Sequence, residues 1–160
     1  MARRSKSTAA VTALEDAGVD FTLHEYEVVE AVGDGYGEAV AVALGTIPQR
    51  VFKTLMASVD GNYVVAIVPV SERLSTKALA RAFGGKKATM ADPAAAERLT
   101  GYVVGGISPL GQKRRHPTYL DETAQIFPTI FVSAGKRGLQ VELAPQDLMA
   151  LTGAHLASLT

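Results

Sequence analysis

The sequence predicts one mixed α/β domain over residues 1–160, of the α+β kind, in which short helices flank a mostly antiparallel sheet. Its 160 residues, 48% hydrophobic and 20% charged, can bury one sizeable core but are few for two ordinary domains. An apolar hairpin lies near the middle, and about seven strand-like runs alternate with about four or five helical ones. Because hairpins pair antiparallel strands, we expect a mixed sheet and not an all-parallel one.

Strands are predicted where apolar residues alternate with polar ones, or run together between turn residues. The clearest case is a hairpin in which 51–59 and 63–69 flank Asp60-Gly61-Asn62. Its second strand is apolar on both faces, so we expect it in the middle of a sheet covered on both sides. The same criteria predict further strands at 21–28, 86–90, 102–104, 119–121, 129–133 and 139–143.

Helices are predicted where a capping residue precedes apolar residues at helical spacing and a glycine follows. Ser7 is the expected cap of the first helix, and Gly18 ends it. Asp92-Pro93 joins a capping residue to a proline at the first helical position, where no amide donor is needed. The predicted helices span 7–16, 38–44, 75–83, 94–99 and 145–151.

The composition excludes several classes of function. The chain has no cysteine, which rules out disulfides, thiolate nucleophiles and zinc–thiolate sites. His24, His116 and His155 lack the spacing of metal ligands, so we expect no metal and no cofactor. No run of about 20 apolar residues could span a bilayer, and the basic start does not continue into a signal-peptide core. We therefore expect a cytoplasmic protein without membrane contacts.

Lys53 is the most informative single residue. It lies in the apolar run Val51-Phe52-Lys53-Thr54-Leu55, and strand alternation puts its ammonium on the same face as Val51 and Leu55. A charge among aliphatic neighbours is costly unless an anion or several acceptors meet it. This indicates a site whose negative partner is a ligand. The alternative is an edge-strand lysine that extends to solvent.

A second unusual segment, Gly105-Gly106-Ile107-Ser108-Pro109-Leu110-Gly111-Gln112-Lys113, follows a predicted strand. It is not a phosphate-binding loop, because Gln112 separates the glycine from the lysine and Pro109 removes an amide. Backbone N–H groups of a glycine pair can instead approach a ligand carbonyl and polarise it. A tight turn is the alternative. We expect this segment and Lys53 to share one pocket.

Two hydroxyl residues are further candidates. Tyr26 falls on the polar face of its predicted strand, so it need not belong to the core. Ser133 ends an apolar strand at a glycine-containing turn, where a ligand could reach its hydroxyl, although a turn-capping serine would have the same pattern.

Together, the Lys53 run, the hairpin, the glycine-rich segment and Val132-Ser133-Ala134-Gly135-Lys136-Arg137-Gly138-Leu139 resemble the YbaK/EbsC family of free-standing aminoacyl-tRNA deacylases. That family is similar to the editing domain inserted in bacterial prolyl-tRNA synthetases. The resemblance runs from the first helix to the last and looks closest to the YbaK branch, which acts on cysteine mischarged onto proline tRNA.

The resemblance implies roles for individual residues. Lys53 would be the key active-site residue, with Gly105 and Gly106 as the backbone wall around the reacting carbonyl. Gln140 stands where the family often has an aspartate, so it could hydrogen-bond a substrate without countering its charge. The other implied contacts are substrate binding by Tyr26, Ser108 and Ser133, and tRNA binding by Lys113, Arg114, Arg115, Lys136 and Arg137.

The reaction implied is cleavage of the ester between an amino acid and the terminal adenosine of tRNA. In the YbaK branch the substrate's own thiol is thought to attack the carbonyl, which suits a chain with no nucleophile of its own. The implied partners are aminoacyl-tRNA(Pro) and prolyl-tRNA synthetase. Three alternatives stay open: a deacylase for alanine or serine, a non-catalytic tRNA-binding or synthetase-binding module, and a small-molecule esterase.

Overall fold

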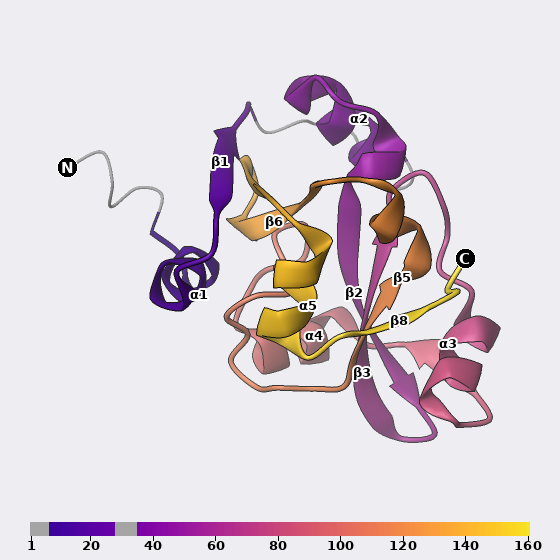
Figure 1. The fold of residues 1–160 in the computed structure, drawn as a ribbon. Helices are drawn as coiled ribbons and strands as arrows, with labels where there is room; N and C mark the ends of the chain where they lie inside the picture. The colour runs from indigo at the N-terminus through magenta and orange to yellow at the C-terminus, as the bar shows by residue number, and fades with distance from the viewer. Residues whose placement is uncertain (1–6, 28–34) are drawn as a thin grey trace.

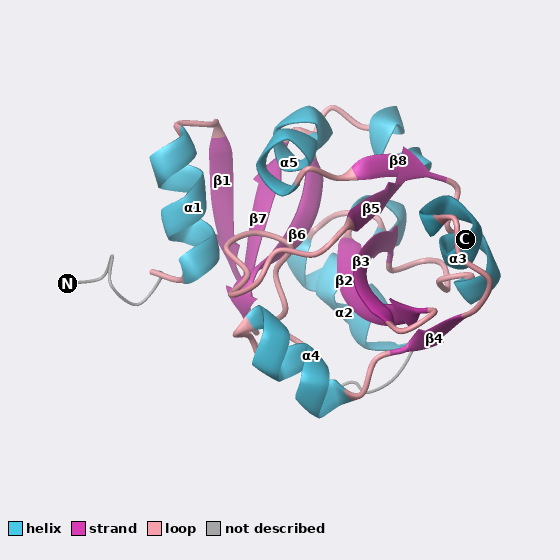
Figure 2. Ribbon diagram, turned by 90° about the horizontal axis from the view of Figure 1, so that it is seen from below, coloured by secondary structure: helices cyan, strands magenta, loops and turns pink. Residues whose placement is uncertain are grey.

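The fold is a mixed α/β arrangement with two sheets. A computed structural model describes residues 7–27 and 35–160, and within these ranges the chain forms five α-helices and eight strands. A three-stranded sheet lies between the first helix and a five-stranded sheet (Figure 1, Figure 2). The predicted class is confirmed, although the strands occupy two sheets and not one. None of the described helices is long and apolar enough to cross a membrane.

The three-stranded sheet is antiparallel and has two unlike faces. Its order is β1 (Phe21–Glu25), β7 (Leu139–Leu143), β6 (Ile130–Lys136). One face packs into the main core beside α1 (Ala9–Ala17) through its buried aliphatic residues. The opposite face has a row of cross-strand partners formed by His24, Gln140 and Ser133. Strand alternation therefore brings polar side chains to the junction between the sheets.

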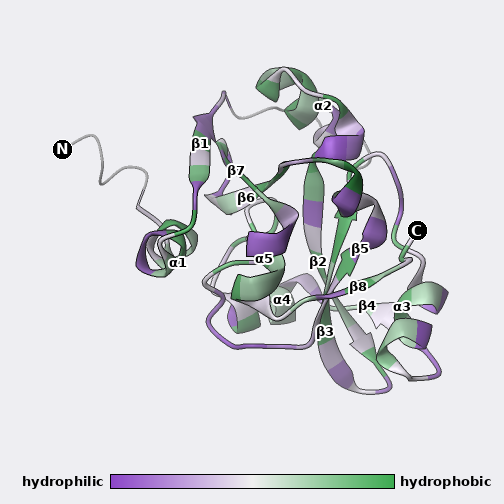
Figure 3. Ribbon diagram, viewed as in Figure 1, coloured by the Kyte–Doolittle hydropathy of each residue, from purple (hydrophilic) through white to green (hydrophobic). Residues whose placement is uncertain are grey.

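The five-stranded sheet is mixed and contains the predicted hairpin. Its order is β4 (Ala88–Met90), β2 (Phe52–Val59), β3 (Asn62–Pro69), β5 (Thr118–Asp121), β8 (His155–Ala157). Asp60 and Gly61 join β2 to β3 with positive φ values of 49° and 87°, as a type I′ turn requires. β3 is central and mostly buried, as predicted. Figure 3 shows hydrophobic residues along the central strands.

The remaining helices are α2 (Gly35–Leu44), α3 (Thr76–Phe83), α4 (Pro93–Thr100) and α5 (Pro145–Thr152). α3 has the predicted cap, because Ser75 Oγ accepts a hydrogen bond from the Ala78 N–H at 3.1 Å. The cap predicted at Ser7 is wrong. Thr8 Oγ1 accepts instead from the Val11 N–H at 3.2 Å, and α1 begins at the next residue.

Residues 102–104 do not form the predicted strand. The Tyr102 hydroxyl donates to the Leu110 carbonyl at 2.6 Å, and the Val104 N–H donates to the Glu97 carboxylate at 2.7 Å. These contacts fold the segment onto its own loop and onto α4. The short strand β8 was not predicted, because its three residues show no alternation and it pairs in parallel with β5. β1 ends at Glu25, and residue 28 of that predicted strand lies outside the described residues.

The two sheets meet at the start of β2. Val51 forms an isolated parallel bridge with Phe131 of β6, and β4 pairs with β2 only from Ala57 to Val59. Between these two contacts, the edge of β2 that faces away from β3 has no strand beside it in the described ranges. The candidate site borders this part of β2.

Candidate active site

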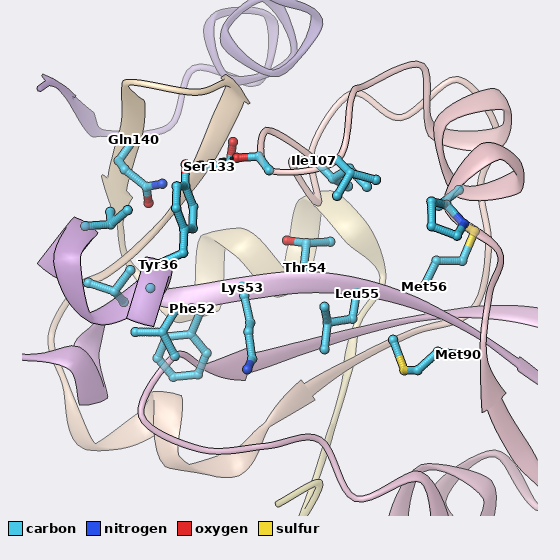
Figure 4. Close-up of a pocket in the computed structure, with 18 of the residues that line it drawn as sticks. Tyr36, Phe52, Lys53, Thr54, Leu55, Met56, Met90, Ile107, Ser133 and Gln140 are labelled. Carbon is cyan, nitrogen blue, oxygen red and sulfur yellow. Dashed lines mark hydrogen bonds between the residues drawn. The ribbon is translucent and has the colours of Figure 1, made fainter. Parts of the chain in front are cut away.

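A cavity of about 320 Å³ lies at the junction of the two sheets. Its walls come from β2, β6 and β7, from the start of α2 and of α4, and from the loop at 104–107. Most lining side chains are apolar, and the polar ones are few (Figure 4). Such a cavity, with a small number of convergent polar groups, is typical of sites for small molecules or for one end of a larger ligand.

Lys53 and Thr54 line the cavity from opposite sides of β2. In Figure 4, Lys53 extends away from Ser133 and Gln140, on the same side as Leu55, as alternation predicts. Thr54 points the other way, toward the side of Ser133 and Gln140. The cavity therefore curves around the edge of β2. It has a partly buried cation at one end and neutral polar groups at the other.

The two predicted backbone glycines differ. Gly105 lines the cavity with a φ of 94°, and added bulk at its α-carbon would collide with the Arg137 guanidinium. Gly106 is buried beside the chain at Lys136, where a Cβ would lie 2.9 Å from the Lys136 Cα, and its N–H donates to the Val103 carbonyl at 2.9 Å. Gly106 therefore cannot supply the amide donor predicted for it, and Gly105 alone keeps that role as a prediction.

Tyr36 lines the cavity and was missed by sequence reasoning. Its hydroxyl donates to the Gly105 carbonyl at 3.5 Å, and the Arg137 guanidinium lies 5.5 Å from its ring centroid. Burial raises the pKa of Tyr36, and Tyr26, which hydrogen-bonds to it, raises it further, whereas Arg137 acts in the opposite direction. Tyr26 packs beside Tyr36 and is not itself a lining residue.

The Gly35-Tyr36-Gly37 pattern was the signal that could have revealed Tyr36. A Cβ at Gly37 would lie 2.5 Å from the Val70 Cβ, so glycine there allows α2 to pack closely over the cavity. Because Tyr36 precedes Gly37, this close packing holds Tyr36 at the cavity wall.

We call the part of the cavity bordered by Thr54, Ser133 and Gln140 the polar chamber. Ser133 and Gln140 are cross-strand partners on β6 and β7. Ser133 Oγ accepts a hydrogen bond from the Gly135 N–H at 3.2 Å, so Ser133 both caps the turn and lines the cavity. Thr54 Oγ1 and Gln140 Oε1 are shielded from solvent and have no hydrogen-bond partner among the residues that the structure describes.

Next to the polar chamber, Glu142 organises a set of satisfied polar contacts that we call the Glu142 network. One carboxylate oxygen accepts from Thr129 Oγ1 at 2.6 Å and from Arg50 Nη2 at 3.2 Å, and the other lies 2.9 Å from His24 Nε2. The Thr129 hydrogen bond is the main cause that lowers the pKa of Glu142; His24 and Arg50 lower it further, while burial opposes them.

The Glu142 network also fixes the start of β2. Arg50 ends a 3-10 helix (Pro48–Arg50) just before the strand, and its Nε donates to the Thr129 carbonyl at 2.8 Å. Its guanidinium lies 5.3 Å from the centroid of the Phe131 ring on β6. These contacts tie β2 to β6 at one end of the cavity, three residues before Lys53 in the sequence.

Other predicted site residues lie elsewhere. Ser108 is fully buried and accepts a hydrogen bond from the Leu110 N–H at 3.2 Å, so its predicted substrate contact is replaced by a turn-stabilising one. Arg115 donates to the Leu151 carbonyl of α5 at 2.8 Å. Lys113, Arg114 and Arg115 are exposed and line no part of the cavity. Arg137 does not line it either, but lies beside two residues that do, Gly105 and Tyr36.

Comparison with known proteins gives a consistent family match. The family model for the aminoacyl-tRNA editing domain matches residues 34–151. A protein of Enterococcus faecalis described as a candidate Cys-tRNA(Pro)/Cys-tRNA(Cys) deacylase, EbsC, is 41% identical over 161 aligned residues, covering 99% of this chain and 96% of that protein. The multifunctional Ser/Thr-tRNA deacylase ProXp-y of Escherichia coli K12 is 29% identical, covering 92% of this chain and 89% of the relative.

The fold has solved counterparts as well. A crystal structure described as a candidate trans-editing enzyme for prolyl-tRNA synthetase superposes with a TM-score of 0.82 and 27% sequence identity. The alignment covers 96% of this chain and 98% of the other. The similarity of fold therefore extends over both sheets.

Proposed function

Because this chain belongs to the aminoacyl-tRNA editing domain family, we propose that it removes cysteine from mischarged proline tRNA, acting as a separate protein on the released aminoacyl-tRNA. The main support is that Lys53, Gly105 and the β6–β7 pair Ser133 and Gln140, from three distant parts of the sequence, line one cavity. The substrate named for the Enterococcus faecalis relative supports cysteine on proline tRNA in particular.

The proposed chemistry uses the substrate's own thiol. The sulfur attacks the ester carbonyl, a C–S bond forms, and the C–O bond to the ribose breaks. The thiol proton ends on the departing ribose oxygen, so the products are free tRNA and a cyclic thiolactone. Such an intramolecular attack needs orientation and charge stabilisation and no nucleophile from the protein. The apolar walls of the cavity suit that task, because electrostatic interactions are stronger where water is excluded.

Lys53 would hold the anionic or sugar end of the substrate. Its side chain lies on the far side of β2 from the polar chamber, which supports contact with the terminal phosphate or ribose and not with the aminoacyl group. The Gly105 N–H, which makes no hydrogen bond within the described residues, would steady the carbonyl oxygen as it gains charge. The hydroxyls of Ser133 and Tyr36 would complete the wall around the ester.

The tRNA would be held by few charges. The net charge of the chain is zero, so long-range attraction to RNA is weak. Arg137 lies beside Gly105 and Lys136 beside Gly106, so these two cations are the contacts best placed for the acceptor end. Weak intrinsic binding suggests that prolyl-tRNA synthetase, as the partner, selects the tRNA.

The test is turnover by the Lys53→Ala variant. Purified protein is incubated with proline tRNA carrying labelled cysteine, serine, alanine or proline, with and without prolyl-tRNA synthetase, and loss of the ester is followed. We expect wild-type protein to act fastest on cysteine and Lys53→Ala to lose at least about 100-fold in kcat/KM, with unchanged circular dichroism and Tm. Lys77→Ala, an exposed lysine of α3, is the matched control.

The same assay separates the alternatives. Faster release of serine or alanine than of cysteine would reassign the substrate within the family. Absence of turnover on every ester would indicate a binding module without catalysis. A fully active Lys53→Ala protein would remove Lys53 from the mechanism.

A further inference from the structure

One edge of β2 has a short gap in its pairing, which we call the open edge. Before the gap, Val51 bridges Phe131 of β6, and after it the segment 57–59 pairs with β4. Between these contacts, and within the residues that the structure describes, no strand lies beside β2 on the side away from β3. The cavity borders the open edge, and Thr54, in the middle of the gap, is one of its lining residues.

The register of β2 on β3 shows which main-chain groups point to the open edge. In an antiparallel pair, alternate residues direct their N–H and C=O groups to the partner strand, and the residues between them direct theirs to the opposite edge. The Val70 N–H donates to the Val51 carbonyl at 2.8 Å. Continued along the register, this alternation directs the main chain of Lys53 and Leu55 toward β3, and that of Thr54 toward the open edge.

Other groups of β2 that point the same way confirm the alternation, and they have partners. The Met56 carbonyl accepts from the Ala91 N–H at 3.0 Å, and Ser58 pairs with Thr89 of β4. By contrast, the Thr54 N–H and C=O have no hydrogen-bond partner in the part of the chain that the structure describes. Main-chain groups are rarely left unpaired away from bulk water, so this donor and this acceptor suit a ligand in the cavity.

We propose that the aminoacyl group of the substrate binds as a one-residue strand against the open edge. Its α-amino group donates to the Thr54 C=O, and its ester carbonyl accepts from the Thr54 N–H. An aminoacyl group carries these two functions on either side of its α-carbon, as a residue of an antiparallel partner strand does. This inference rests on the proposed function and adds the main chain of Thr54 to the groups that act on the substrate.

The direction of this pairing agrees with the contact proposed above for Lys53. A ligand that runs antiparallel to β2 places its amino end toward Met56 and its carbonyl end toward the start of β2. The ester oxygen and the ribose therefore lie toward Lys53, the residue before Thr54. A parallel pairing would divide the two hydrogen bonds between two ligand residues, and an aminoacyl group has only one.

The bond from the Thr54 N–H has a chemical consequence. The ester carbonyl oxygen gains negative charge as it is attacked, and a donor that is already fixed in place stabilises that charge without reorganisation. β2 lies between β4 and β3 in the sheet, so the Thr54 N–H is fixed in this way. It is a second donor for the carbonyl, in addition to the Gly105 N–H of the same cavity.

Main-chain pairing reads the backbone of the amino acid and not its side chain. It requires a free α-amino group, and it distinguishes the two configurations at the α-carbon. Directly opposite residues of an antiparallel pair have their side chains on the same face. An L-aminoacyl group therefore directs its side chain to the face of Thr54, toward Ser133 and Gln140 (Figure 4). A D-aminoacyl group would direct it to the face of Lys53.

The first test is amide hydrogen exchange, followed by NMR on the unmodified protein. Without ligand, the Thr54 amide should exchange at least about tenfold faster than the Leu55 amide, which points to β3 and is the matched control. Saturation with 3′-deoxyadenosine that carries L-cysteine on a 3′-amide should slow exchange at Thr54 by about tenfold and leave Leu55 unchanged. Equal protection of the two amides in the free protein, or no change at Thr54 on binding, would overturn the inference.

The second test compares ligands by calorimetry. An analogue with 3-mercaptopropionate in place of cysteine lacks the α-amino donor, and should bind at least about tenfold more weakly. The D-cysteine analogue should also bind more weakly than the L form. Lys53→Ala should weaken the cysteine and mercaptopropionate analogues by similar factors, because Lys53 acts on the ribose end. Equal binding of these two analogues to the wild type would contradict pairing through the α-amino group.

The outcomes also separate this inference from the proposed function. A protein that releases cysteine from tRNA but shows no protection of the Thr54 amide would keep the proposed reaction and lose the strand-like binding. A protein that releases no amino acid from any tRNA, yet shows the expected protection and the expected order of analogues, would sustain the inference and reject the reaction.

Discussion

The polar chamber and the Glu142 network adjoin each other, but their polar side-chain atoms differ in whether they have hydrogen-bond partners. In the network, the Glu142 carboxylate meets Thr129, Arg50 and His24. In the chamber, Thr54 Oγ1 and Gln140 Oε1 have no hydrogen-bond partner within residues 7–27 and 35–160. Gln140 and Glu142 are two residues apart on one face of β7, so strand geometry does not cause the difference.

The difference separates polar residues whose hydrogen bonds stabilise the fold from polar residues that line the proposed substrate cavity without such bonds. Satisfied groups such as the Glu142 network fix the start of β2 and with it the cavity wall. Buried groups left unsatisfied lower stability. The predictions below test that distinction through stability alone.

The largest expected effect is the loss of Glu142. Glu142→Ala removes the acceptor shared by three side chains and leaves the partly buried Arg50 without its carboxylate, so the free energy of unfolding should fall by about 2 kcal/mol. Urea denaturation followed by circular dichroism measures it. Glu15→Ala on the exposed side of α1 is the control and should change stability by less than about 0.5 kcal/mol. Equal values for the two variants would contradict the structural role of the network.

A smaller change in the free energy of unfolding, of opposite sign, is expected for a substitution at Gln140. Gln140→Met replaces an amide whose buried Oε1 has no hydrogen-bond partner within the described residues by an apolar side chain of similar shape, so the ligand-free protein should gain about 1 kcal/mol. The same urea measurement applies, and Gln146→Met at an exposed position of α5 is the control. A loss of stability at Gln140 would mean that the chamber is satisfied in solution, and the comparison would fail.

The smallest expected effect is a loss of folding stability at acid pH. The pKa of Glu142 is lowered from 4.5. Its carboxylate therefore contributes stability that is complete above the unfolded pKa and is lost as pH falls below about 4.5 through the folded value. Because the side chain is 25% exposed, the loss should stay below about 1 kcal/mol. Unfolding at about pH 5 and about pH 3 measures it, and Glu142→Gln should show a smaller acid-induced decrease than the wild type.

Much of the fold was predictable from local patterns. The β2–β3 hairpin was predicted from Asp60-Gly61, a pair that accepts positive φ. The helix α3 was predicted from its capping residue Ser75 and from Gly84, the glycine that ends it. The strand predicted at 102–104 was wrong, because alternation cannot show that a tyrosine hydroxyl and a glutamate hold the segment elsewhere.

The candidate site was predicted in part. Lys53, Gly105, Ser133 and Gln140 were selected from the sequence, and the structure places them around one cavity. Gly106 and Ser108, which were predicted as site residues in the same glycine-rich segment as Gly105, face inward instead. Tyr36 was not predicted. A segment's composition indicates that a site is near, while the direction of each side chain depends on neighbours from other strands.

By itself, the sequence determined the class of fold, the hairpin, most helix ends and the unusual lysine, because these depend on spacing and on conformational preferences within a few residues. Only the tertiary structure decided that part of the β2 edge has no strand beside it within the described residues, and that Lys53 and Thr54 face different ends of one cavity. It also decided that, among these residues, Gln140 Oε1 has no hydrogen-bond partner while the Glu142 carboxylate has three. Those facts depend on which side chains meet across separate sheets, and no local pattern encodes such meetings.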